Sequence, residues 1–418
     1  MDHLGPEGSE IIPSLPLGKT AIDVLADFLR YLLWCARAYI EGTHANGVDL
    51  WLSVEKEIEF VLSHPNGWES RQMWMRKAAI SSGLIPDDHS GHNRFAFITE
   101  GEANLHFSIH NGLSPSAFED GDGVVIVDAG EETIDISGYA RNSNIPPSFD
   151  EIGAPQCHFQ GLVSVSMYAR MFFTEFLSKS IFLEDLDDIV LCFERTVKPC
   201  FRNSEKPQFI KFGSARDNDA SCNIRFGQLK LAGEKVAEFF EPSIQCIVAG
   251  VHEQRKAGKR NFTNVVLVGK FSACDWLYTQ VAKRLKSDGF SVFRPDYHMD
   301  KAIVEGALFN YIDRHPKRSI MRSLYHASRK LALAFDIGTT HSGISYCILA
   351  SGTVPQIKSV TRFRGQVNES LKIPTIIYYD ASGKVRAVGA EAVQEDNYGT
   401  AEEEGWVKVE WFCFAISV

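Results

Sequence analysis

Two stretches of this sequence place an aspartate just before a polar turn that contains glycine. In the later one, residues 331–345, which read LALAFDIGTTHSGIS, an apolar run ends at Asp336 and is followed by Gly338, Thr339 and Thr340. Glycine lets the backbone approach a ligand closely, and threonine hydroxyls beside backbone N–H groups can hold phosphate oxygens. An aspartate at a strand end can hold the water shell of a magnesium ion. Taken alone, so short a motif equally fits a plain hairpin with a glycine turn.

The earlier stretch repeats this pattern. Residues 123–139 read GVVIVDAGEETIDISGY, with Asp128 at the end of an apolar run and Gly130, Thr133 and Asp135 in the turn that follows. Aligned on their aspartates, the two stretches share glycine two residues later, isoleucine eight later and serine nine later. This spacing predicts two similar antiparallel hairpins. The pair resembles the phosphate loops of the actin, sugar-kinase and heat-shock ATPase superfamily, and the resemblance implies that the hairpins come from two similar halves, face each other across one cleft and hold a nucleotide from both sides.

Two further stretches end predicted strands with residues suited to contact a ligand. Residues 94–99, RFAFIT, precede Glu100, and a carboxylate at the carboxyl end of a strand lies where α/β sheets bind ligands. Glu100 is thus a candidate for orienting a water molecule, although the pattern alone favours a simpler role at a helix N-terminus. Residues 264–269, NVVLVG, run into Lys270, and a strand, a glycine and a helix in succession can form a nucleotide-contacting turn.

The segments around these residues alternate between strand and helix patterns, which indicates an α/β fold. The LGKT at 17–20 is not a P-loop, because Pro13 stands where that loop needs glycine, and Thr20 instead predicts a helix N-cap. The expected helices are 21–41, 69–82, 159–177, 181–195, 227–251 and 300–311. The expected strands are 58–63, 94–99, 264–269 and 372–380, with a short sheet in 202–217 and a solvated acidic turn at 402–404.

The composition fits a folded protein and argues against some classes of function. A length of 418 residues suggests two or three domain-sized units, and a hydrophobic share of 44% can fill their cores. A net charge of −10 argues against nucleic acid as the main partner. Nine cysteines without a CxxC pair fit reduced thiols in a cytoplasmic protein, and no apolar run reaches membrane-spanning length.

Together these motifs resemble one family. The stretches DIGTTHSG from Asp336, VDAGEETID from Val127 and VLVGKF from Val266 are similar to the two phosphate motifs and the adenosine motif of the seventy-kilodalton heat-shock chaperones. FERTVKPCFRN at 193–203 resembles the family's helix over adenine, and DKAIVEGAL at 300–308 its domain-closing helix. The divergent fungal branch is the most similar. The resemblance implies an actin-like ATPase fold, a duplicated ribonuclease H-like fold whose two lobes bind MgATP, without the family's peptide-binding domain.

The order of the motifs departs from that family, in which the Asp336-type motif comes first and the Asp128-type motif later. A true circular permutation and a fusion of two tandem gene copies both produce the reversed order. The resemblance implies that lobe I is made of three separate segments: its truncated first part at 331–418, its second part at 17–113 and its closing helix at 301–313. Lobe II would be 114–300. Residues 1–16 would be a disordered start, and 314–330 would be a solvated basic linker.

The resemblance also implies roles for individual residues. Asp336 and Asp128 would hold magnesium through water, and Glu100 would orient the attacking water. The residues expected to contact ATP are Gly338, Thr339, Thr340, Gly130, Thr133, Asp135, Gly269, Glu194, Lys198 and Asp300.

The expected site departs from the family at several positions. Glu131 and Glu132 replace glycines of the second phosphate loop and would repel phosphates unless they point away or bind the metal. Lys270 replaces the second glycine of the adenosine motif, and the family's phosphate-contacting lysine would fall near Cys413. We therefore expect weak ATP binding and hydrolysis near background.

Two functions are compatible with these patterns. One is a slow chaperone-type ATPase with co-chaperone-like protein partners. The other is a degenerate binding or scaffold module without turnover. A sugar kinase is a distant third, because nothing in the sequence resembles a dedicated sugar site.

Overall fold

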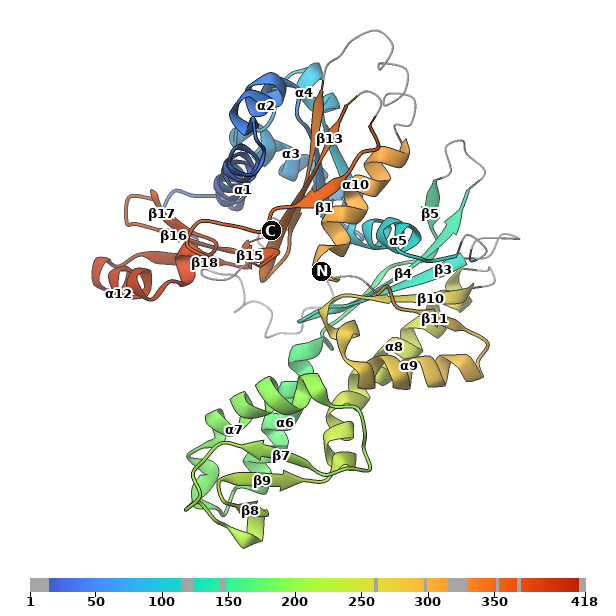
Figure 1. Ribbon diagram of the computed structural model, residues 1–418, viewed down its shortest axis with the longest axis vertical. Helices are drawn as coiled ribbons and strands as arrows, with labels where there is room; N and C mark the ends of the chain where they lie inside the picture. Colours follow the sequence, from blue (N-terminus) through green and yellow to red (C-terminus); the bar gives the residue numbers. More distant parts are fainter. Residues whose placement is uncertain are drawn as a thin grey trace. The chain divides into compact units, whose positions relative to one another are not determined.

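The computed structural model describes residues 15–114, 117, 123–142, 148–258, 262–296, 299–314, 329–350, 353–366 and 370–412 (Figure 1). The fold is mixed α/β, as the sequence predicts, and divides into two compact units. Unit 1 comprises Met1–Phe107 and Asp300–Val418, and unit 2 comprises Ser108–Met299. The expected disordered start up to residue 14, the break at 144–147, most of the basic linker and Cys413 lie outside the described residues.

Unit 1 is built on a sheet of six strands. They are β1 (Glu59–His64), β2 (Phe95–Thr99), β12 (Lys330–Ile337), β13 (His341–Leu349), β14 (Ile357–Ser359) and β15 (Lys372–Pro374). The order is β14-β13-β12-β1-β2, with β15 also paired to β13. The parallel neighbours β1 and β12 are far apart in the sequence, and their register runs from Glu59 opposite Ala332 to Leu62 opposite Phe335.

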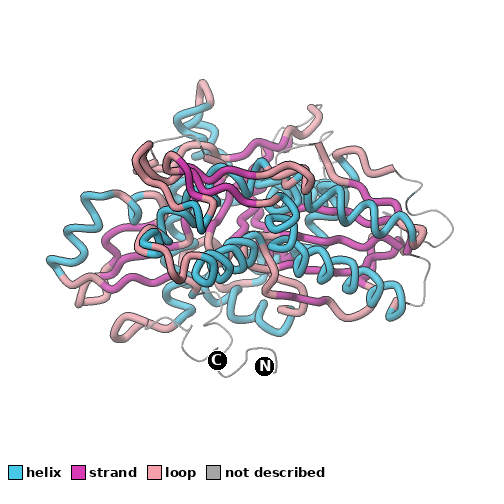
Figure 2. The backbone as a smooth tube through the Cα atoms, turned by 90° about the horizontal axis from the view of Figure 1, so that it is seen from below, coloured by secondary structure: helices cyan, strands magenta, loops and turns pink. Residues whose placement is uncertain are grey.

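Helices cover both faces of this sheet (Figures 1 and 2). They are α1 (Ala21–Thr43), α2 (Gly47–Val54), α3 (Gln72–Ser81), α4 (His89–Asn93), α5 (Glu100–His110) and α10 (Ala302–Arg314). Leu333 and Phe335 of β12 share a core with α1, α2 and α3, whereas Ala332 and Ala334 share a core with α5 and α10. Because side chains alternate along a strand, Asp336 lies on the face covered by α5 and α10.

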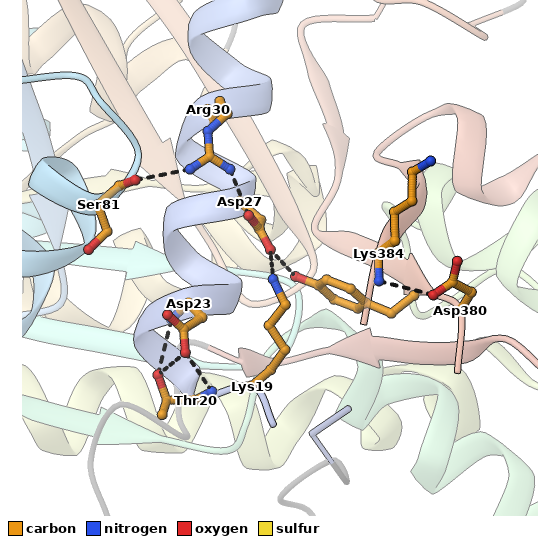
Figure 3. Close-up of polar contacts among 9 residues, drawn as sticks. Lys19, Thr20, Asp23, Asp27, Arg30, Ser81, Asp380 and Lys384 are labelled. Carbon is orange, nitrogen blue, oxygen red and sulfur yellow. Dashed lines mark hydrogen bonds and ion pairs between the residues drawn. The ribbon is translucent and has the colours of Figure 1, made fainter. Parts of the chain in front are cut away.

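The start of α1 is held by polar contacts that Figure 3 shows. Thr20 caps the helix as predicted, and Thr20 and Asp23 form a reciprocal capping box. One turn later, the Asp27 carboxylate accepts hydrogen bonds at 2.7 Å from both Lys19 Nζ and Arg30 Nη1. The tyrosyl hydroxyl of Tyr379 donates to the same carboxylate at 3.0 Å, which fixes α1 to a second, smaller sheet.

This smaller sheet of unit 1 has three strands in the order β17-β16-β18. The strands are β16 (Ile376–Tyr379), β17 (Val385–Val388) and β18 (Val407–Glu410), and the helix α12 (Glu395–Glu404) lies between β17 and β18 in the sequence. The sequence prediction of one strand at 372–380 was wrong at Thr375, where the chain passes from β15 in the large sheet to β16 in the small one. The acidic run at 402–404 is the last turn of α12 and not an isolated turn.

Unit 2 is built on a second sheet of six strands. They are β3 (Gly123–Ala129), β4 (Ile134–Arg141), β5 (Phe149–Glu151), β6 (Gln156–His158), β10 (Phe262–Val268) and β11 (Ser291–Phe293). Their order is β11-β10-β3-β4-β5, with β6 also paired to β4. Val125 and Val127 of β3 share a core with the helices α6 (Leu162–Phe176), α7 (Leu186–Cys192), α8 (Gly233–Ala257) and α9 (Asp275–Ser287). Asp128, which alternates with them, lies on the other face.

A smaller three-stranded sheet completes unit 2. It has the order β7-β9-β8, with β7 (Gln208–Lys211), β8 (Ile224–Arg225) and β9 (Gln228–Leu231). The predicted sheet is therefore present, but only one of its strands lies in 202–217. The expectation that 227–251 is helical was wrong at its start, because β9 occupies 228–231 and α8 begins at Gly233.

The two large sheets have the same topology. In each, an antiparallel hairpin (β12–β13 or β3–β4) has two parallel strands beside its first strand and two antiparallel strands paired to its second. Since all six strands of one sheet have a counterpart in the other, the sequence repeat at Asp128 and Asp336 belongs to a repeat of a whole structural unit.

The ends of the predicted basic linker are folded. Arg314 is the last residue of α10 and its guanidinium lies 2.6 Å from the Glu102 carboxylate. Lys330 begins β12 and pairs with the buried carboxylate of Glu59. Both positions therefore belong to regular elements and not to a linker, although the side chain of Arg314 is exposed as predicted and only that of Lys330 is largely buried. Among the described residues, no helix combines the length and the apolar character needed to cross a membrane.

Candidate functional site

The hairpin at Asp336 is antiparallel, as predicted, and its turn is braced from β15. Asp336 lies opposite Gly343, and Ile337 lies opposite Ser342. A Cβ atom on Gly338 would lie 2.6 Å from the His341 carbonyl oxygen, so the close approach of the two strands requires glycine there. The Thr340 carbonyl accepts a hydrogen bond from Thr375 N–H at 2.9 Å, which fixes the predicted phosphate turn to the strand beside it.

The carboxylate of Asp336 is buried and both of its oxygens have partners. Its side chain is 2% exposed. The Ser63 hydroxyl at the end of β1 donates to Oδ1 at 3.1 Å, and Lys372 Nζ donates to Oδ2 at 2.9 Å. A buried carboxylate is stable only when its charge is compensated, and here Lys372 supplies the compensating charge.

Lys372 reaches Asp336 across a glycine. In the register of the sheet, Asp336 on β12 lies opposite Gly343 on β13, which in turn lies opposite Lys372 on β15. Residues opposite each other on adjacent strands point to the same face, so Asp336 and Lys372 flank a position that has no side chain. A Cβ on Gly343 would lie 3.6 Å from Lys372 Cγ, in contact with the lysine stem. The Lys372 side chain thus passes over a residue without a side chain on its way to Asp336.

Glu100 lies at the same edge of this sheet. The parallel strands β12, β1 and β2 end at Ile337, His64 and Thr99, and Glu100 follows directly as the first residue of α5. Glu100 is two strands from Asp336, roughly 10 Å across the sheet at about 4.8 Å per strand. The N–H groups of the next two residues are capped by side chains: Gly101 by Asn66 and Glu102 by Thr99.

The hairpin at Asp128 has the register of the hairpin at Asp336. Asp128 lies opposite Asp135 and Ile136 lies opposite Val127, and the corresponding pairs in the other hairpin are Asp336 with Gly343 and Ile344 with Phe335. Gly130 N–H donates to the Thr133 carbonyl at 2.8 Å to close the turn. The position that holds Lys372 in unit 1 is Cys157 in unit 2.

Asp135 is partly buried beside this turn. Burial raises the pKa of its carboxyl above the usual range, although hydrogen bonds from Cys157 and Thr133 act in the opposite direction. The Thr133 hydroxyl donates to Oδ2 of Asp135 at 2.7 Å. The two predicted ATP contacts Thr133 and Asp135 therefore bind each other in this structure.

The turn that carries Glu131 and Glu132 is docked on the N-terminus of α6. The backbone N–H groups of Gly161, Leu162 and Val163 donate to the carbonyl oxygens of Glu132, Gly130 and Glu131 at 3.0, 3.2 and 2.9 Å. These N–H groups would otherwise lack intrahelical acceptors. The backbone of the turn is thus held from beneath by α6.

Gly269, the glycine after β10, lies against Asp128. Its φ is +85°, in the region that favours glycine. A Cβ atom there would overlap Oδ1 of Asp128 and lie 2.5 Å from the Ala129 carbonyl oxygen. The predicted adenosine motif and the second predicted phosphate motif are therefore in direct contact within unit 2.

Four charged residues gather beside this contact. Lys270 Nζ lies 3.1 Å from the Glu131 carboxylate, and the buried Lys198 Nζ lies 3.8 Å from Glu194 and 2.7 Å from Ser166 Oγ. Burial lowers the pKa of Lys198, while Glu194 and Glu131 act to raise it and Lys270 to lower it further. We define Glu131, Glu194, Lys198 and Lys270 as the unit 2 charge cluster. The π-helical turn Phe193–Val197, an uncommon element often found at functional sites, carries Glu194.

The structure brings the predicted site residues together in two groups. In unit 1, Asp336, Gly338, Thr339 and Thr340 share one hairpin, and Glu100 lies at the same sheet edge. In unit 2, Gly269 contacts Asp128, and the hairpin with Gly130, Thr133 and Asp135 adjoins the charge cluster that contains Glu194 and Lys198. Asp300 lies in the short helical turn Met299–Lys301 before α10. That the two hairpins face each other stays a prediction.

Sequence patterns did not identify Lys372 or Ser63 as site residues. The strand that begins at Lys372 was predicted, but its pairing with Gly343 was not. The sequence feature that could have indicated this pairing is Gly343, the glycine that lies opposite Asp336.

The buried carboxylate of Asp336 does not fit its expected role of holding a hydrated magnesium ion. Magnesium keeps several of its waters and needs exposed carboxylate oxygens to bind them, whereas Ser63 and Lys372 already contact the two oxygens of Asp336. Among the described residues, no three His, Cys, Asp or Glu side chains are grouped so as to hold a metal ion.

The comparisons with known proteins add no family to this geometry. No protein-family model matches the sequence, and no curated protein matches it.

Proposed function

We propose that this chain is an ATP-binding domain of the heat-shock-chaperone type, with the actin-like ATPase fold and with weak or no hydrolysis. The observation that carries the proposal is the repeat of one six-stranded topology in both units, with an aspartate and a glycine at the same register positions of each hairpin. A fold in which two similar sheets each present a glycine turn suits a ligand with several phosphates.

The hairpin residues would act mainly by positioning the phosphates. The glycine turns at Gly338 and Gly130 bring backbone close to a ligand, and Thr339 and Thr340 add hydroxyl groups. Phosphoryl transfer depends on positioning and on compensation of charge rather than on covalent chemistry by the protein. Glu100, at the carboxyl end of β2, would orient a water molecule for attack.

The charges around the hairpins support weak turnover. Lys270, which could otherwise neutralise a phosphate, is paired with Glu131, and Lys372 is paired with Asp336. Each cation would have to exchange its carboxylate for a phosphate. This favours the second candidate function, a binding or scaffold module that holds nucleotide without hydrolysing it.

Two measurements separate these functions. Isothermal titration with ATP tests binding, and a single-turnover assay with radiolabelled ATP tests hydrolysis, with Glu100→Gln as the comparison variant. Binding with a hydrolysis rate that Glu100→Gln lowers indicates an ATPase. Binding with a rate equal in both proteins indicates a module without turnover, and no binding rejects both functions.

A further inference from the structure

We propose that the ammonium of Lys372 takes the place of a metal ion at Asp336, so that nucleotide binding at this hairpin does not depend on magnesium. The inference rests on the proposed function for its ligand, but its geometric part concerns only Asp336 and Lys372. It follows from the disagreement between the role expected for Asp336 and the contacts that this aspartate makes.

The first step is the burial of the pair. The Asp336 side chain is 2% exposed and the Lys372 side chain 25%, with 2.9 Å between Nζ and Oδ2. The ammonium thus supplies, at the carboxylate itself, the positive charge that a bound metal ion would otherwise supply. A cation tethered at this point can compensate the carboxylate and still present positive charge toward solvent.

The second step is the register that places the lysine. Asp336, Gly343 and Lys372 lie in one row across three strands, and the central residue has no side chain. In the equivalent row of unit 2, the residues are Asp128, Asp135 and Cys157. The cation is therefore a feature of the unit 1 hairpin and not of the fold that both units share.

The third step is electrostatic. A magnesium ion at Asp336 would meet the ammonium at short range, and two cations beside one buried carboxylate repel each other strongly. Lys372 and a metal should therefore compete for the same place. Removal of the lysine charge should create a site for the metal, and removal of the carboxylate should abolish it.

The test compares wild type, Lys372→Met, Asp336→Asn and Lys372→Met/Asp336→Asn in thermal unfolding with and without millimolar magnesium chloride. We expect magnesium to leave the wild-type midpoint unchanged and to raise that of Lys372→Met by several degrees, because ligands of the native state stabilise it. It should not raise the midpoint of the double variant. Equal responses of wild type and Lys372→Met would overturn the proposal.

Manganese binding followed by electron paramagnetic resonance covers the case in which Lys372→Met does not fold. The wild type and Asp336→Asn should then bind manganese equally, and weaker binding by Asp336→Asn would show that wild-type Asp336 already holds a metal.

ATP titrations complete the test. Wild-type affinity should be equal in EDTA and in magnesium, whereas a tenfold or greater requirement for magnesium would refute the proposal. If no protein binds ATP under either condition, the proposed function fails, while the unfolding and manganese series still decide the role of Lys372.

Discussion

Gly269 has no side chain at the point where its backbone passes the carboxylate of Asp128, and a methyl group there would overlap Oδ1. This contact joins the end of β10 to the hairpin β3–β4. It explains in physical terms why the strand that resembles an adenosine motif ends in glycine.

Gly269→Ala should therefore cost far more stability than its backbone angle alone implies. A residue with a side chain in the region that Gly269 occupies, with φ 85° and ψ 166°, costs roughly 1–3 kcal/mol, and the overlap with Asp128 should bring the total to about 3 kcal/mol or more. Gly289 is a matched control, since it has a φ of +83° and no atom within 4 Å of its added Cβ. Urea unfolding of both variants measures the difference, and equal losses would show that Asp128 moves aside without cost.

Glu131→Gln should strengthen ATP binding. Glu131 is paired with Lys270 at 3.1 Å, so the change removes a negative charge and releases a cation. The net contribution of one exposed charge pair is up to about 1 kcal/mol, which corresponds to about fivefold in affinity. Calorimetric titration checks the effect, with Glu205→Gln at an exposed position of the same unit as the control. An unchanged affinity would mean that the pair lies away from the phosphates.

Asp135 should make stability depend on pH. Burial raises the pKa of its carboxyl in the folded state above the unfolded value of 3.8, so the folded state binds the proton more tightly. The resulting stabilisation is complete below pH 3.8 and is lost as the pH rises through the folded pKa. Asp135→Asn keeps an oxygen for the Thr133 hydroxyl and should reduce this slope. Parallel urea titrations from acidic to neutral pH measure it, and identical slopes would contradict the assignment.

Lys330→Met should destabilise unit 1 at the junction of its two chain segments. Lys330 and Tyr311 both contact the carboxylate of Glu59, each at 2.5 Å, and Glu59 is buried. Removal of one partner of a buried pair costs about 3 kcal/mol, because the other charge stays buried. The neighbouring exposed residue provides the control, Arg329→Met, which should change stability by less than about 0.5 kcal/mol. A small effect at both positions would argue against the pairing of β1 with β12 as a stabilising junction.

The sequence predicted much of the fold because its strongest patterns are local. Thr20 caps α1 as expected, and an antiparallel hairpin is present at both Asp128 and Asp336, as their shared spacing predicted. Pairings between distant segments were harder. No local pattern shows that Lys372 lies across from Gly343, or that the strand at 228–231 joins a sheet with 208–211.

The sequence predicted which residues belong to the candidate site, but it did not predict which of the charged residues pair with each other. Glu131 and Lys270 were each identified as departures from a nucleotide site, yet their mutual contact depends on how β10 packs beside β3. In the same way, the expected metal role of Asp336 follows from its place at a strand end, while its burial depends on Ser63 and Lys372 from two other strands.

The central claim is that this chain binds ATP through its hairpins, and isothermal titration with ATP of wild type and Gly338→Val tests it most directly. A valine at 338 would clash with the His341 carbonyl and fill the turn, so it should weaken binding by tenfold or more, about 1.4 kcal/mol. Val354→Ala, at an exposed position of unit 1, should bind like wild type. Wild-type binding that Gly338→Val weakens and Val354→Ala does not would support the account. Absence of heat with wild type at millimolar ATP, or equal affinities of all three proteins, would contradict it.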